Sequence, residues 1–215
     1  MPQQFENPEE HRGGQEIDEF DSHAIQGVLF HRQSDVAIGT VRMILPVNSA
    51  EGSLPIEHLL RENSIQLDDF VRVKNAVEVS RFAISKEFRR RWSDDPANTP
   101  TYAISRQESA RLANLPCLSL IQFLLAQSVE RGVFYWTAVM EASFLRMLAR
   151  MGIHFISIGP VVFHHGFRQP CYCYLPTMLE QMRCEHPDYW DVITNAGELS
   201  QRLIALSEAA HPVTT

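Results

Sequence analysis

The chain has 215 residues, of which 45% are hydrophobic and 21% are charged, a balance that suits one sizeable globular core and is short for two. No apolar run in the sequence approaches the ~18 to 20 residues that a membrane-spanning helix needs, so the sequence predicts no transmembrane segment. The net charge of −7 disfavours nucleic acid as a partner. Because residues 1–4 lack the basic-then-apolar order of a secretory signal, we expect a cytoplasmic protein.

The acidity is concentrated at the front of the chain. Residues 1–21 contain one base, Arg12, and seven acids: Glu6, Glu9, Glu10, Glu16, Asp18, Glu19 and Asp21. We predict an acidic leader over residues 1–22.

The first predicted elements are strands. Residues 24–30 and 37–45 are rich in β-formers and flank a polar turn, a pattern that predicts an antiparallel hairpin. Residues 55–60 are expected to form a short helix, and residues 75–84 a strand rich in valine and aromatic residues.

The second half alternates helices with strands. Pro116 suits the first turn of a helix, and apolar residues then recur at helical spacing until Gly132 ends the pattern. Further along the chain we predict a strand over 133–140, a helix over 141–151, a strand over 153–158 with extended continuations over 161–165 and 169–175, and helices over 176–186 and 198–209.

A hairpin that leads into alternating strands and helices predicts the α/β class, with a mixed sheet covered by helices on both faces. We expect a single domain over residues 1–215. Its parts are the acidic leader, a sheet core over 23–175, and C-terminal helices over 176–215.

The cysteines leave one question open. Cys117, Cys171, Cys173 and Cys184 are neither dense nor regularly spaced, which predicts reduced thiols. Histidines and cysteines cluster in sequence at His164, His165, Cys171, Cys173, Cys184 and His186, and such side chains suit zinc. The usual C-x2-C pair is absent, so we assign no metal and interpret these as ordinary strand and helix residues.

Two short charged strings carry most of the functional information. The leader ends in Glu16-x-Asp18-x-x-Asp21, and a predicted strand contains Glu78-x-x-Arg81, while Arg42 lies on another strand between them. These residues could converge on one cleft. Residues three apart on a regular strand point to opposite faces, but a β-bulge would re-aim them and free a backbone N–H.

This set of side chains suits acyl transfer to an amine. Glu78 could accept the proton of an amine that attacks a thioester, and a freed N–H could stabilise the resulting oxyanion. Arg42 and Arg81 would pair with the carboxylates or hold an anionic substrate group, and the leading acids would bind the cationic amine. The alternative is an ordinary structural set of ion pairs, which sequence alone leaves open.

A basic cluster follows the second string. Lys86, Arg89, Arg90 and Arg91 lie within six residues and make a local field that attracts phosphates or an acidic protein. A solvated helix start explains the same cluster equally well.

In order and spacing, the charged residues resemble the acidic and basic core of the autoinducer (acyl-homoserine-lactone) synthases, which are GNAT-like acyltransferases. The resemblance implies a three-layer GNAT-like sandwich with a mixed, splayed sheet. It implies that Glu78 and Arg81 are catalytic and that Glu16, Asp18, Asp21, Arg42 and Phe82 bind substrate. It also implies that the basic cluster meets phosphopantetheine or a carrier protein.

A closer resemblance spans nearly the whole chain. It is to the acyltransferases associated with PEP-CTERM/exosortase gene systems, and it is carried by FENPEEHRGGQEIDEFDSHA, GTVRMILP, LPIEH, EVSRFAISKEFRRR and GIHFISIGPVVFHHGFRQPCY. These relatives begin with a further strand and helix, which we expect this chain to lack.

The resemblances imply an N-acyltransferase without a permanently bound cofactor. Its co-substrate would be acyl-CoA or acyl-phosphopantetheine on acyl carrier protein, and its acceptor a small amine. The alternatives are an autoinducer synthase that uses S-adenosylmethionine and a non-catalytic homologue that binds acyl carrier protein. The absence of a Gly-x-Ser-x-Gly elbow disfavours an acyl-enzyme route.

Overall fold

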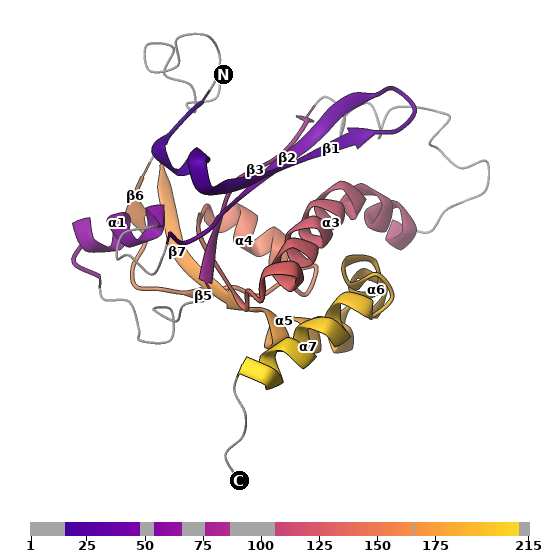
Figure 1. Ribbon diagram of the computed structural model, residues 1–215. Helices are drawn as coiled ribbons and strands as arrows, with labels where there is room; N and C mark the ends of the chain where they lie inside the picture. The colour runs from indigo at the N-terminus through magenta and orange to yellow at the C-terminus, as the bar shows by residue number, and fades with distance from the viewer. Residues whose placement is uncertain (1–15, 48–53, 66–75, 87–105, 165, 211–215) are drawn as a thin grey trace.

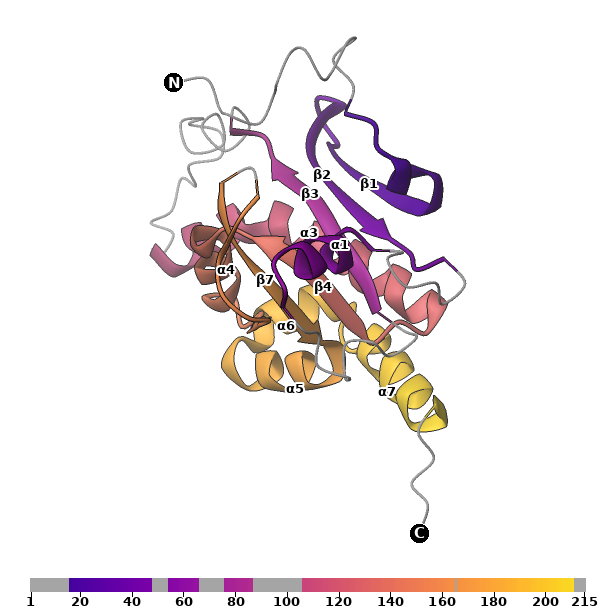
Figure 2. The ribbon, with the colours of Figure 1, turned by 90° about the vertical axis from the view of Figure 1, so that its left-hand side faces the viewer.

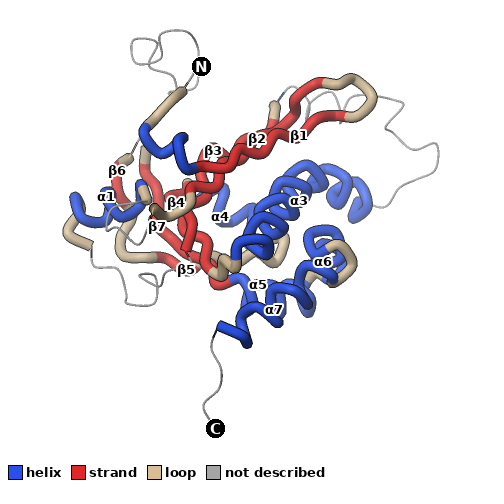
Figure 3. The backbone as a smooth tube through the Cα atoms, viewed as in Figure 1, coloured by secondary structure: helices blue, strands red, loops and turns tan. Residues whose placement is uncertain are grey.

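The computed structural model describes residues 16–47, 54–65, 76–86, 106–164 and 166–210. Within these ranges the centre of the molecule is one mixed sheet with strand order β1-β2-β3-β4-β7-β5, and β6 pairs with β7 (Figures 1 and 3). The strands are β1 (Ala24–His31), β2 (Val36–Ile44), β3 (Ala76–Ile84), β4 (Tyr135–Met140), β5 (Ile156–Ser157), β6 (Val162–Phe163) and β7 (Phe167–Tyr174).

Helices cover both faces of the sheet, as predicted (Figure 2). One face packs against the main core and carries α3 (Arg106–Arg131), α4 (Ala142–Ala149), α5 (Leu175–Glu185), α6 (Pro187–Thr194) and α7 (Glu198–Ala210). The other face carries the 3-10 helix η1 (Glu19–His23) and α1 (Pro55–Glu62). A second, smaller core lies beneath α1 and contains Ile44, Leu54, Ile56, Leu60 and Ile158.

The predicted hairpin is confirmed. β1 and β2 are antiparallel, and β2 and β3 are antiparallel as well. The register of β2 and β3 shifts between Thr40 and Arg42, because Thr40 lies opposite Ala83 whereas Arg42 lies opposite Ser80. Two residues of β3 therefore face one residue of β2, which is a β-bulge.

The sheet forks between β3 and β4. These strands are parallel, but their ladder joins only Ala76–Glu78 to 135–137 and ends at the pair Glu78 and Thr137. Beyond this pair β3 continues to Ile84 alongside β2, while β4 continues to Met140 alongside β7. Strands β1–β3 thus lean away from β6 and β7, and the sheet is splayed (Figure 1).

The long helix begins earlier than predicted. α3 starts at Arg106, and Pro116 lies inside it rather than in its first turn. Proline removes one helical hydrogen bond, but the apolar stripe that follows it, including Leu118 and Leu125, is fully buried and holds the helix on the sheet. Gly132 ends the helix as predicted, in a left-handed conformation with φ of 63°.

Two features of the C-terminal half differ from the sequence prediction. The strand predicted over 153–158 is reduced to β5, because Ile153 directs its side chain into the main core instead of continuing a ladder. Helix α6 was not predicted at all. Its sequence signals are Pro187 at the first turn and Asn195, which ends the helix with φ of 53°.

Gly27 provides a test of how α3 packs on the hairpin. A Cβ added there would lie 2.6 Å from Cε1 of Phe123 on α3. We expect Gly27→Ala to lower the free energy of unfolding by about 1 to 3 kcal/mol, since the ring must shift to admit a methyl group. Chemical denaturation measures this loss. In a Phe123→Leu background the same substitution should cost much less, and an equal cost in both backgrounds would contradict this packing.

Candidate active site

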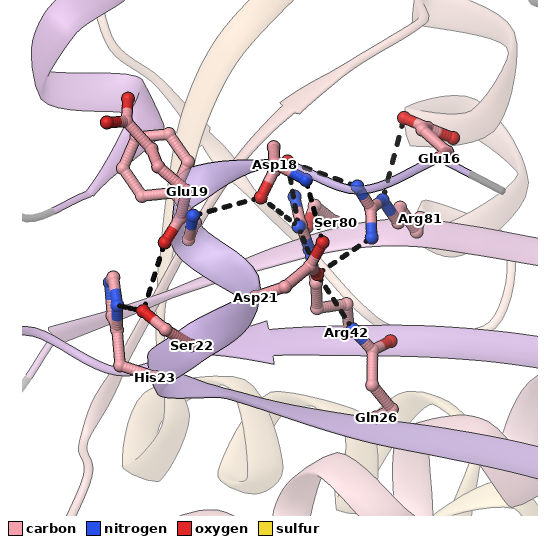
Figure 4. A network of polar contacts seen from close by, with 11 residues as sticks. Glu16, Asp18, Glu19, Asp21, Ser22, His23, Gln26, Arg42, Ser80 and Arg81 are labelled. Atoms are coloured by element: carbon pink, nitrogen blue, oxygen red, sulfur yellow. Dashed lines mark hydrogen bonds and ion pairs between the residues drawn. The ribbon is translucent and has the colours of Figure 1, made fainter. Parts of the chain in front are cut away.

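Helix η1 brings two of the three leading acids, Asp18 and Asp21, together. Asp18 caps this helix: the Phe20 N–H donates to Asp18 Oδ1 at 3.0 Å, and the Asp18 N–H donates back to Asp21 Oδ2 at 2.9 Å. This reciprocal arrangement is a capping box, which fixes both carboxylates one turn apart. The carboxylate oxygens that the cap leaves over, Asp18 Oδ2 and Asp21 Oδ1, point toward the sheet (Figure 4).

Arg42 reaches these carboxylates from β2. Its Nη1 donates to both oxygens of Asp18 and to Asp21 Oδ1, each at 2.8 Å. Its Nε donates to Ser80 Oγ on β3 at 2.9 Å. The Arg42 side chain is only 5% exposed, so a nearly buried guanidinium has its charge matched by carboxylates.

Arg81 joins the same group through the β-bulge. Its φ is 49°, a left-handed conformation that is uncommon for a residue with a Cβ. Its Nη1 donates to Asp21 Oδ1 at 2.8 Å, and its Nη2 donates to Asp18 Oδ2 at 3.1 Å. The bulge considered from the sequence is therefore present, and it turns Arg81 onto the face that Arg42 occupies.

Three carboxylates surround the two guanidiniums, since Glu16 Oε1 also lies 3.5 Å from Arg81 Nε. Burial acts to raise the pKa of Asp21, but the Asp18 N–H and both guanidiniums outweigh it and lower this pKa to about 2. Gln26 Nε2 adds a further hydrogen bond to Asp21 Oδ1 at 3.0 Å. Asp21 is thus ionised and already paired with both arginines.

Glu78 lies at the point where the sheet forks. It is 4% exposed, and its Oε2 accepts a hydrogen bond of 2.6 Å from the N–H of Ile56 in the first turn of α1. Burial raises the pKa of Glu78 to about 8, against the opposing effects of the Ile56 N–H and Arg42. Glu78 lies opposite Ile44, and Arg42 lies opposite Ser80, so all four side chains share one face of the sheet.

The structure brings six of the predicted site residues into one region: Glu16, Asp18, Asp21, Arg42, Glu78 and Arg81. Phe82 follows the bulge and packs instead toward α4, where its ring centroid lies 5.2 Å from that of Phe144. Lys86 is exposed beyond the end of β3. The rest of the basic cluster, Arg89, Arg90 and Arg91, lies outside the described residues.

Sequence reasoning missed several members of this site. Ser80 and Gln26 bond to Arg42 and Asp21, and the N–H of Ile56 bonds to Glu78. Thr137 is buried at the fork, where its Oγ1 donates to the Val77 carbonyl at 3.0 Å. The spacing of Asp18 and Asp21 was a usable signal for the capping box, and Pro55 was one for the start of α1.

Other kinds of site are not found in the part of the chain that the structure describes. It contains no group of three or more histidine, cysteine, aspartate or glutamate side chains that could hold a metal ion. Among the same residues, no helix is both long and apolar enough to cross a lipid bilayer.

Comparison with known proteins points to one fold. Residues 3–95 match the family described as an acetyltransferase (GNAT) domain. No curated protein sequence matches the chain significantly.

Two solved structures with similar folds are acyl-transferring synthases. FeeM, an N-acyl amino acid synthase from uncultured soil microbes, is 18% identical over 80% of this chain and 82% of its own, with a TM-score of 0.50. BjaI, a CoA-dependent acyl-homoserine lactone synthase solved with SAM and isopentyl-CoA, is 14% identical over 86% and 70%, with a TM-score of 0.52. The fold is accordingly the mixed α/β fold of the GNAT acyltransferases.

Asp21 tests the charge network. We expect Asp21→Asn to lower the free energy of unfolding near neutral pH by about 1 to 3 kcal/mol, because both guanidiniums lose a shared carboxylate. The pKa of Asp21 is lowered from 3.8 to about 2 in the folded protein, so its contribution is present above pH 4 and is lost as the pH falls toward 2.

Denaturant titrations at several pH values measure this effect. Glu19→Gln is the matched control, since Glu19 belongs to the same helix and its carboxylate points away from the arginines (Figure 4). A wild type and an Asp21→Asn variant with equal stability at neutral pH would contradict a stabilising role for the network.

Proposed function

We propose that this protein transfers an acyl group from a thioester to a small-molecule amine by direct attack, without an acyl-enzyme intermediate. The donor is acyl-CoA or an acyl group on acyl carrier protein, and no cofactor stays bound between turnovers. Glu78 is the general base, Arg81 acts beside it at the reacting centre, and the thioester enters the fork between β3 and β4.

The observation that supports this proposal best is the position of a buried acid, Glu78, at the point where the sheet forks. The β3–β4 ladder ends at Glu78 and Thr137. Beyond that pair, the peptide groups of β3 on the β4 side have no ladder partner on β4. A pantetheine arm is an extended chain of amides, so it suits a gap between two strands that have separated.

The chemical step needs only one base and a stabilised oxyanion. The amine nitrogen forms a bond to the thioester carbon while its proton passes to Glu78, directly or through water. A peptide N–H of β3 near the bulge stabilises the tetrahedral oxyanion. The C–S bond then breaks, and the thiolate leaves and takes up the proton, which gives an amide and a free thiol.

The charge network positions this machinery. Asp18 and Asp21 tie η1 to β2 and β3 through Arg42 and Arg81. The three acids exceed the two guanidiniums by one negative charge, and Glu16 is 62% exposed. In this proposal the surplus charge attracts the cationic acceptor, and Phe82 contacts the acyl donor.

The acceptor is the least constrained part of the proposal. The similar structure FeeM is named an N-acyl amino acid synthase, and BjaI was solved with SAM. We favour an amino acid or another simple amine, with S-adenosylmethionine as the alternative. Mass spectrometry of extracts from producing cells separates them, since acylated amines support the first and homoserine lactones support the second.

We further propose that the enzyme works in the cytoplasm, in association with a PEP-CTERM/exosortase system. The support is the sequence resemblance alone. Deletion of the gene from such a host should alter an acylated amine pool, and an unchanged pool would contradict the association.

Glu78→Gln tests the base directly. We expect acyl transfer to fall by at least ~100-fold, the effect of losing a general base, while donor binding is unchanged. Glutamine keeps an oxygen that can accept the Ile56 N–H, so the fold should persist. Thioester consumption measures the rate, and Glu130→Gln on the surface of α3 is the control. An unchanged rate would remove Glu78 from the chemistry.

The raised pKa of Glu78 predicts two pH dependences. The base is ionised only as the pH approaches and passes about 8, so kcat/KM should rise through that range and then level off. Because the folded pKa exceeds the value of 4.5 expected on unfolding, stability should decline as pH rises from 4.5 to about 8. Glu78→Gln should remove this decline, and an identical decline in the variant would contradict the burial of this acid.

A further inference from the structure

The β6–β7 hairpin projects beyond the end of β4. Met140, the last residue of β4, lies opposite Gln169, and in the described part of the chain residues 167 and 168 of β7 have ladder partners on β6 alone. Apart from its chain neighbours, none of the described residues would lie within 4 Å of a Cβ added at Gly166, in the turn of the hairpin. The end of this hairpin therefore stands clear of the described fold, at the margin of the molecule (Figure 1).

Two exposed aromatic rings flank the turn of this hairpin. Phe163 and Phe167 lie opposite each other in register, and their ring centroids are 5.5 Å apart in an edge-to-face arrangement. At 75% and 76%, they are the most exposed large apolar side chains that the structure describes, and Val161 just before β6 is 53% exposed. We call Val161, Phe163 and Phe167 the hairpin tip. Apolar area of this kind favours transfer out of water.

The hairpin tip lies within a stretch of sequence that has no acidic side chain. Although the chain contains 26 acids, none occurs between Glu141 and Glu180, a stretch that forms α4, β5, β6, β7 and the start of α5. This stretch contains Arg146, Arg150 and Arg168 together with three histidines. Because the net charge of the chain is −7, the excess of negative charge is carried entirely by the other segments. The segments around the tip are thus the positively charged part of an acidic protein.

The rings and two of these arginines lie on the same side of the sheet. Alternate residues of a strand share a face, so Phe167 shares its face with Cys171, which is buried in the main core. Helix α4 covers that face, and its Arg146 and the adjoining Arg150 are exposed. Apolar rings beside cations match the two layers of an anionic membrane surface, in which acyl chains lie beneath charged headgroups.

The shape of the hairpin tip favours lipid over a protein partner. Apolar anchors in protein interfaces usually lie near the centre of a patch, where the surrounding contacts exclude water. Here the rings stand at the end of a two-stranded ribbon, next to a polar turn that begins with His164. Such a ribbon can place its rings at the boundary of headgroups and acyl chains without needing a complementary pocket.

We propose that the hairpin tip inserts reversibly into an anionic phospholipid surface, with Phe163 and Phe167 among the acyl chains and the nearby arginines at the phosphates. The contact is peripheral and is argued from the surface alone, so it stands independently of the proposed acyl transfer. Because β7 starts at the end of the sheet where β3 and β4 have separated, the contact brings the open end of the fork to the membrane. For the proposed reaction, the consequence is release of the acylated product directly into lipid.

Co-sedimentation of the full chain with vesicles of phosphatidylcholine and phosphatidylglycerol tests the contact. The wild type should bind at low salt, and should bind less at high salt and on vesicles of phosphatidylcholine alone, since headgroup charge contributes to the binding. Phe163→Ser with Phe167→Ser should lower the partition coefficient by at least roughly tenfold, because the two rings no longer enter lipid. Phe163→Leu with Phe167→Leu keeps apolar side chains and should stay within about threefold of the wild type.

Matched controls exist elsewhere on the surface. Val28→Ser with Phe30→Ser changes apolar side chains of the β1–β2 hairpin that are 52% and 56% exposed, and this pair should bind vesicles as the wild type does. Arg146→Gln with Arg150→Gln should weaken binding to the anionic vesicles, whereas Arg202→Gln on α7, at an arginine that is 53% exposed, should not.

Several results would overturn the membrane contact. The wild type could fail to bind the anionic vesicles, bind them no better than phosphatidylcholine alone, or lose no affinity in the serine variant. An equal loss in the β1–β2 control would show that the hairpin tip has no special role. Rings that are needed for binding a protein partner, with vesicle binding unchanged, would assign the tip to that partner. Absence of acyl transfer, with vesicle binding that depends on both rings, would instead refute the enzyme and keep the contact.

Discussion

The sharing of two carboxylates by two arginines is the constraint on which this site depends. Asp18 and Asp21 are held in one helical turn, Arg42 comes from β2, and Arg81 comes from the bulge of β3. No one of these segments would hold its charges in place alone, because each guanidinium is largely removed from water. Arg81 has a left-handed backbone conformation, which is strained, and the ion pairs of its side chain hold it in that conformation.

The fork of the sheet and the network of carboxylates and guanidiniums both depend on strand β3. The bulge that redirects Arg81 occurs on the part of β3 that has left β4, so the strand can twist there without breaking a central ladder. At the last shared rung, Glu78 is buried beneath the start of α1, and Thr137 bonds across to β3. A buried acid is thereby held at the rung where β3 and β4 separate, next to the charge network.

Much of this fold could be predicted from periodicity and turn signals. Local sequence pattern predicts the hairpin, the strand that contains Glu78 and the helix that ends at Gly132. The opposite charges of the acids and the arginines also predict that these side chains converge. The start of α3 could not be predicted, because burial of its apolar stripe outweighs the local effect of Pro116. The pairing of Arg42 with Ser80 and of Glu78 with Ile56 depends on register and on a distant helix, which no local pattern specifies.

The most direct measurement is a crystal structure with a non-hydrolysable thioether analogue of decanoyl-CoA. If the fork admits the donor, the pantetheine arm will lie between residues 79–84 of β3 and 138–140 of β4. The carbon that replaces the thioester carbonyl will then lie near Glu78, within reach of an amine that this carboxylate can deprotonate. An analogue bound on another surface, with the space between the two strands filled by side chains, would contradict the proposed chemistry.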